Sequence, residues 1–190
     1  MKPRRYALAV VAVLLCAPLT AGCSFGGDGG GAITAEQAKP RIEALLSGTV
    51  GAVQPPVQYL DELYDVREHT DWKHDSDGKS LVLKKRHLMP MISQPKRTVL
   101  LQQLKDYWKA QGYTLHEDNN GNGVQGVSAT APDGTKVGVS FLGGGSATIT
   151  AGIDPVVTPP LDHPLRDTST SPRPPGTPEP GTQDDPYWSH

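Results

Sequence analysis

Strict alternation of apolar residues with small or polar ones in the second half of the chain limits the fold more than any other feature. The apolar positions of the two clearest segments are Val137, Val139, Phe141, Ala147, Ile149, Ala151 and Ile153. A period of two residues places these side chains on one face of a β-sheet. Short connections rich in Gly, Asn, Asp and Ser separate the segments and suit hairpins. We predict an antiparallel meander with strands at 113–117, 124–131, 136–141 and 147–153.

Two helices are predicted upstream of the meander, with a further strand at 81–88 between them. The first begins after Thr34, which can form a capping box with Gln37, and ends at Gly48. The second begins after Ser93, carries apolar residues at helical spacing, and ends at Gly112. Helices are the natural cover for the apolar face of a meander. The predicted fold class is therefore α+β, a two-layer sandwich over residues 33–154 in which two helices cover an antiparallel β-meander.

Residues 1–22 have the parts of a cleaved export signal. A positive start at 1–5 precedes an apolar run at 6–17, which is shorter than the roughly 20 residues of a membrane-spanning helix. Residues 19–23, LTAGC, then resemble the lipobox of bacterial lipoproteins, with Thr20 where leucine is commonest. The resemblance implies cleavage before Cys23 and attachment of a diacylglycerol to the Cys23 thiol. An ordinary secretory signal followed by a chance cysteine is the alternative.

The segments that flank the predicted domain are poor in large apolar residues. Residues 23–32 read as a lipidated cysteine and a glycine-rich tether, and 155–190 as a disordered proline-rich tail. In its Ala, Gly, Pro and Arg usage, and in a helix that ends Tyr107-Trp108 before Gly112-Tyr113, the chain resembles small uncharacterised lipoproteins of actinobacteria. That resemblance implies a lipid-anchored protein on the extracytoplasmic face of the cell membrane, and it implies no activity or functional residue.

Charge and cysteine content exclude several classes of function. Without the signal, the chain carries 15 basic and 20 acidic side chains, and it has no basic stripe that would bind nucleic acid. Its most basic stretches hold Lys84, Lys85, Arg86, Lys96 and Arg97. We interpret these residues as a solvated face. Cys16 leaves with the signal and Cys23 is lipidated, so the mature domain has no thiol for catalysis, metal binding or redox exchange.

A polar stretch at 69–77 contains the candidate metal ligands His69, Asp71 and His74. Imidazole and carboxylate groups together bind zinc, but a zinc site needs three or four converging ligands. The spacing here matches no compact metal-site signature. We therefore expect a solvated polar loop, with a turn at 75–79 and with Trp72 packed in the core.

Residues 118–123, DNNGNG, match the first six positions of a helix–loop–helix calcium loop. That motif requires a glutamate at its twelfth position, where this chain has Ala129, and it requires flanking helices rather than strands. A hairpin is therefore preferred.

Two functions from different classes fit these observations. The first is a non-catalytic binding or envelope-assembly module, held to the membrane by its lipid, with another envelope protein as a candidate partner. The terminal Tyr187-Trp188 is a candidate docking tag for such a partner. The second is an envelope hydrolase or metal-dependent enzyme that uses the His/Asp loop at 69–77. The sequence predicts no cofactor and no catalytic residue, and we favour the first function.

Overall fold

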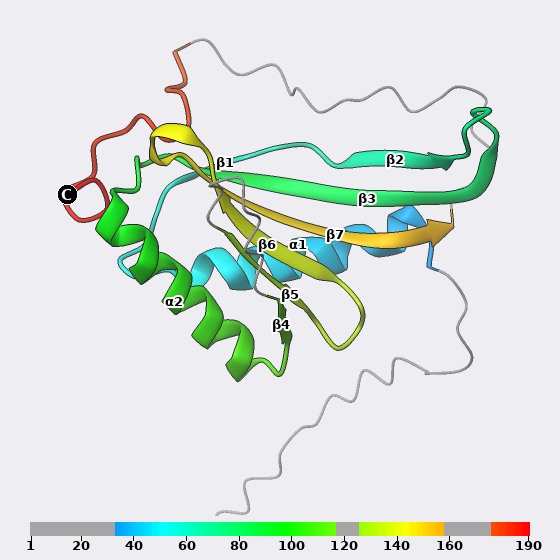
Figure 1. Cartoon of the computed structure of the whole chain (residues 1–190), viewed down its shortest axis with the longest axis horizontal. Coiled ribbons are helices and arrows are strands. Elements are labelled where there is room, and N and C mark those ends of the chain that lie inside the picture. The colour runs from blue at the N-terminus through cyan, green and yellow to red at the C-terminus, as the bar shows by residue number, and fades with distance from the viewer. Residues whose placement is uncertain (1–32, 117–125, 158–175) are drawn as a thin grey trace, which may run out of the picture. The chain divides into compact units, whose positions relative to one another are not determined.

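The computed structural model describes residues 33–116, 126–157 and 176–190. Two helices, one short 3₁₀ turn and a set of strands make up these ranges (Figure 1). In chain order the elements are α1 (Ala35–Gly51), β1 (Tyr59–Asp61), β2 (Asp65–Thr70), β3 (Ser76–Leu88), α2 (Gln94–Ala110), β4 (Thr114–His116), β5 (Gly126–Thr130), β6 (Lys136–Phe141), η1 (Gly143–Gly145) and β7 (Ala147–Val157).

The strands of the described ranges form one antiparallel sheet. Its order is β1-β3-β7-β6-β5-β4, and β2 also pairs with β3, beyond the end of β1. The predicted meander corresponds to β4, β5, β6 and β7, each paired with the next. Both helices lie on one side of the sheet (Figure 1). The predicted α+β two-layer sandwich is confirmed.

Helix boundaries follow local chemistry. The capping box at Thr34 and Gln37 is present, with Oγ1 of Thr34 accepting from the Gln37 amide at 3.3 Å. Helix α2 begins after Ser93 and stops before Gly112, whose φ of +75° suits a glycine. The predicted end of α1 at Gly48 is wrong, because the helix continues to Gly51. A Cβ at position 48 would lie 2.2 Å from the Tyr107 hydroxyl, so this glycine serves close packing between the helices.

The core lies between the helices and the sheet. Apolar side chains from alternate positions of the central strands point into it, together with the inner faces of α1 and α2. Trp108 on α2 is fully buried and donates its indole N–H to Oγ1 of Thr49 on α1 at 3.1 Å. Its hydrogen bond satisfies the polar end of a large buried side chain and joins the two helices.

The segment between the first helix and β3 differs from the prediction. β3 already begins at Ser76, so the turn expected at 75–79 lies earlier, where the amide of Asp71 bonds the carbonyl of Asp75 at 3.0 Å. The β2–β3 hairpin extends past the helix layer. Trp72 at its tip is 85% exposed, and its expected place in the core is wrong because the tip projects beyond the packed layers.

The end of the chain packs against the domain. Trp188 is fully buried and donates its indole N–H to the carbonyl of Pro55 at 3.1 Å, and Gln183 forms a bridge with Pro90. The expectation of a disordered tail is therefore wrong for 176–190, and also for 155–157, which extend β7. Residues 158–175 lie outside the described residues, as do the predicted signal, Cys23 and tether.

Candidate functional site

The candidate metal ligands of the 69–77 stretch do not converge. Nε2 of His69 lies 2.7 Å from Oδ1 of Asp154 on β7, and its Nδ1 lies 3.9 Å from Asp77. The Asp71 carboxylate instead accepts the backbone N–H of Lys73 at 2.7 Å and so fixes the hairpin turn. Among the residues that the structure describes, no group of three or more His, Cys, Asp or Glu side chains could hold a metal ion. The calcium-like sequence at 118–123 lies outside them.

The basic residues grouped as a solvated face are dispersed in the structure. Lys85 faces away from the helices, whereas Lys84 and Arg86 point between α1 and the sheet and are only 9% and 2% exposed. Lys96 lies over the ring of Tyr187, 3.5 Å from its centroid. The interpretation as a solvated face is wrong for Lys84 and Arg86, since a period of two places even-numbered residues of β3 inward.

Arg86 and Lys84 belong to a charge cluster, which we define as Glu43, Asp61, Lys84 and Arg86. The two cations are buried and the two carboxylates are partly exposed. Arg86 Nε donates to Asp61 at 2.8 Å and Nη2 donates to Glu43. Lys84 Nζ lies 2.8 Å from Glu43 and 3.1 Å from Asp61. Two positive charges thus face two negative charges. Such a cluster joins α1 to β1 and β3 and leaves no charge for a ligand.

The cluster fixes the ionisation of its members. The hydrogen bond from Lys84 holds the pKa of Glu43 below its ordinary value. Desolvation acts in the opposite direction and raises this pKa, but the positive charges of Arg86 and Lys84 lower it further. Desolvation opposes ionisation of Asp61, but hydrogen bonds from Arg86 and Lys84 outweigh it and lower the pKa. All four groups are therefore charged at neutral pH, so the cluster is a structural element rather than an acid–base pair.

A carboxylate–imidazole–hydroxyl chain lies on the opposite face of the sheet. Nε2 of His87 is 2.5 Å from Glu62, and its Nδ1 is 2.9 Å from Oγ1 of Thr148. These residue types also occur in hydrolases. Here Thr148 is buried near the start of β7, paired in the sheet with His87 and with Ser140. The backbone amides around Thr148 are already bonded to the neighbouring strands and cannot form an oxyanion hole. The hydrogen bonds of Glu62, His87 and Thr148 therefore serve to hold strands together.

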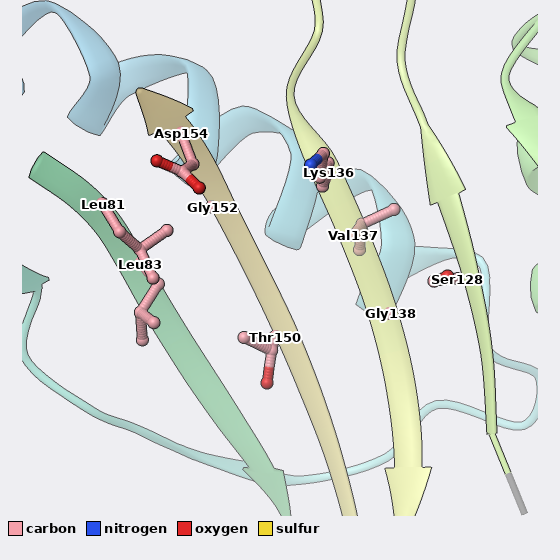
Figure 2. Close-up of a pocket in the computed structure, with 9 residues that line it drawn as sticks. All are labelled: Leu81, Leu83, Ser128, Lys136, Val137, Gly138, Thr150, Gly152 and Asp154. Atoms are coloured by element: carbon pink, nitrogen blue, oxygen red, sulfur yellow. The ribbon is translucent and has the colours of Figure 1, made fainter. Parts of the chain in front are cut away.

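The pocket that could take a ligand lies on this open face, by which we mean the face of the sheet turned away from α1 and α2 (Figure 2). Two glycines, one on each of the neighbouring strands β7 and β6, form its floor. Gly152 pairs with Leu83 and Lys136, and Gly138 pairs with Thr150 and Ser128. Because neither glycine has a side chain, the surface is hollow between its neighbours. The pocket has a volume of about 270 Å³.

The walls of the pocket differ in chemistry. Leu81 and Leu83 of β3 form an apolar wall, and Figure 2 shows both on one side of the hollow. Thr150 and Lys136 provide a hydroxyl and an ammonium group. Asp154 adds a carboxylate at the same end, and this carboxylate lies 2.7 Å from Nε2 of His69. Within the described ranges Lys136 has no ion-pair partner, and an apolar wall beside such an ammonium group suits a small amphipathic acid.

Sequence reasoning missed this pocket, although a signal for it was present. The outward positions of a half-exposed strand ordinarily carry polar side chains, and β6 and β7 have Gly138 and Gly152 there instead. A Cβ at position 152 would lie 2.8 Å from the carbonyl oxygen of Val82, so close strand packing also calls for this glycine. Only the cross-strand register shows that the two glycines are diagonal neighbours.

Comparison with known proteins gives no family. No protein-family model matches the chain, and no curated protein matches it at a significant level. In the part of the chain that the structure describes, no helix is long and apolar enough to cross a membrane.

Proposed function

We propose that the protein is a lipid-anchored binding module on the extracytoplasmic face of the cell membrane, and that its ligand is a small amphipathic acid. The lipobox-like sequence at 19–23 supports the anchor. The pocket on the open face supports ligand binding. The single observation that carries the proposal is an ion-pair-free Lys136 beside the apolar wall of Leu81 and Leu83, over a floor without side chains.

The size and chemistry of the pocket favour binding over catalysis. Its volume lies just below the range of drug-sized ligand sites, roughly 300–1,000 Å³, so the ligand must be small. The acid group of the ligand would lie at Lys136 within reach of the Thr150 hydroxyl, and the apolar part would cover the two leucines. The described lining has two hydroxyl groups, on Ser128 and Thr150, and no histidine that could activate either of them as a base.

Fluorescence titration tests the proposal with 8-anilinonaphthalene-1-sulfonate, a dye that joins an aromatic body to one anionic group. The wild-type domain is expected to enhance its emission in a saturable manner, and octanoate is expected to displace it. Lys136→Gln removes the charge and should weaken binding by about fivefold, the equivalent of roughly 1 kcal/mol for a partly solvated charged contact.

Two further variants separate the pocket from non-specific dye binding. Gly138→Ala adds a methyl group to the pocket floor, where the new Cβ meets only ordinary contacts, the nearest being 3.4 Å from Cβ of Ser128. This variant should also bind more weakly. Lys109→Gln removes an exposed charge on α2, in the other layer, and should bind as the wild type does. Equal binding by all four proteins would contradict the proposal.

A further inference from the structure

The exposed tip of the β2–β3 hairpin carries a side chain that folding leaves in water. Trp72 is 85% exposed, and its only described ring partner is the ammonium of the adjacent Lys73, 4.9 Å from the ring centroid. The other two tryptophans of the chain, Trp108 and Trp188, are fully buried. An exposed indole at a projecting tip is free to contact another surface with both its apolar ring and its N–H.

The tip lies at the end of the domain where the chain enters it. The carbonyl of Ile33 accepts the amide of Val157 at 2.9 Å, and Val157 pairs in turn with Lys79 at the start of β3. Figure 1 shows the hairpin tip, the start of α1 and the end of β7 at one end of the sheet, with the C-terminus at the other. The segment that links Cys23 to the domain therefore joins it on the side of Trp72.

Chain lengths make contact between the tip and a membrane feasible. From Lys79 to the turn at Asp75 the hairpin advances about four residues, or roughly 13 Å, beyond the entry point. The ten residue steps from Cys23 to Ile33 span at most about 35 Å when extended. A lipid attached at Cys23 would thus hold the entry end of the domain within about 35 Å of the bilayer, a range that includes the roughly 13 Å separation at which the tip touches it.

We propose that Trp72 inserts its indole into the interfacial layer of the membrane and, with the lipid at Cys23, orients the domain with this end towards the bilayer. Tryptophan favours that layer because its ring is apolar while its N–H can remain hydrogen-bonded. Lys73 can extend towards the headgroups beside the ring. This inference rests on the lipid anchor of the proposed function.

The charge of the tip selects the kind of lipid. Residues 68–79 of the hairpin carry two lysines, Lys73 and Lys79, and four acidic residues, Glu68, Asp71, Asp75 and Asp77. The Asp71 carboxylate accepts the amide of Lys73 within the turn, and the Asp77 carboxylate accepts the amide of Lys79 in β3. A net negative tip is repelled by anionic headgroups at low salt. The contact is therefore one with a zwitterionic interface, and anionic lipid should weaken it.

Tryptophan fluorescence tests this directly, because Trp72 is the exposed member of the three indoles. The lipidated mature protein is bound to phosphatidylcholine vesicles, and attachment is scored separately by flotation. Brominated phosphatidylcholine should quench a third or more of the emission of the vesicle-bound protein. Iodide, a quencher in the water phase, should quench the vesicle-bound protein less than it quenches the unlipidated Cys23→Ser protein in detergent-free solution. Trp72→Phe should abolish the lipid-dependent quenching while its flotation remains.

A matched control places an indole at the opposite end. Leu142 precedes η1, is 57% exposed and lies at the far end of β7, so Trp72→Phe/Leu142→Trp should float and show no quenching by brominated lipid. Floating wild-type protein whose Trp72 stays open to iodide and unquenched by brominated lipid would overturn the inference, leave the anchor standing and point to a protein partner for Trp72. Wild-type protein that does not float would overturn the anchor, and this inference with it.

Discussion

The buried indole of Trp188 gives the sharpest stability prediction. Replacing Trp188 with alanine removes a fully buried side chain and its hydrogen bond to the carbonyl of Pro55. A buried tryptophan covers about 150–250 Å², which at about 25 cal/mol per Å² corresponds to roughly 4–6 kcal/mol as an upper bound. We expect Trp188→Ala to lower the free energy of unfolding by about 3–5 kcal/mol, in line with large-to-small core substitutions.

Urea denaturation followed by circular dichroism at 222 nm measures this loss. Tyr187→Ala, which removes the half-exposed neighbour of the same segment, should cost less than about 1.5 kcal/mol. Removal of 176–190 should cost at least as much as Trp188→Ala, because it also removes the backbone bonds from Met91 to Gln183 and from Ser93 to Trp188. A loss below 1 kcal/mol for Trp188→Ala would refute the conclusion that this segment is part of the folded domain.

The charge cluster and the proposed lipid anchor yield three further predictions. Arg86→Met should lower the free energy of unfolding, measured by urea denaturation, by about 2 kcal/mol. This loss is smaller than that for a fully enclosed ion pair, because the carboxylate partners of Arg86 are partly solvated. The control variant Lys79→Gln, on the exposed part of β3, should change the free energy of unfolding little. Because the pKa values of Glu43 and Asp61 are lowered by folding, their contribution is complete above about pH 5 and is lost as the pH falls through their folded values; Glu43→Gln/Asp61→Asn should flatten the decline of stability between pH 5 and 3. Cys23→Ser should move the protein from the membrane fraction to the soluble fraction, and undiminished retention would contradict the anchor.

Short-range patterns predicted the regular elements. The alternation at 137–141 and 147–153 and the capping chemistry at Thr34 depend on neighbours within a few residues, and the structure bears them out. The predicted helix end at Gly48 was wrong because this glycine is needed for close packing against Tyr107, 59 positions away in the chain. Glycine at a helix end and glycine at a helix crossing look alike in a sequence.

The C-terminal segment and the charge cluster depend on long-range contacts. Proline, glycine and charge around Trp188 predict disorder, and only the site formed by Pro55, Met91 and Ser93 makes burial of the indole favourable. In the sequence Lys84 and Arg86 resemble solvated cations, because their partners Glu43 and Asp61 lie far away in the chain, on α1 and β1. The pocket was missed for the same reason, since its floor requires the register between two strands.

Mapping a ligand onto the backbone tests the central claim most directly. In ¹H–¹⁵N correlation spectra of the labelled domain titrated with octanoate, the largest shifts are expected at the open-face residues Gly138, Thr150 and Gly152, with the signal of the Lys136 side-chain ammonium moving as well. The shifts should saturate and should shrink in Lys136→Gln. Shifts confined to the helix layer, or none at these residues at millimolar octanoate, would contradict the account of the open face as the binding surface.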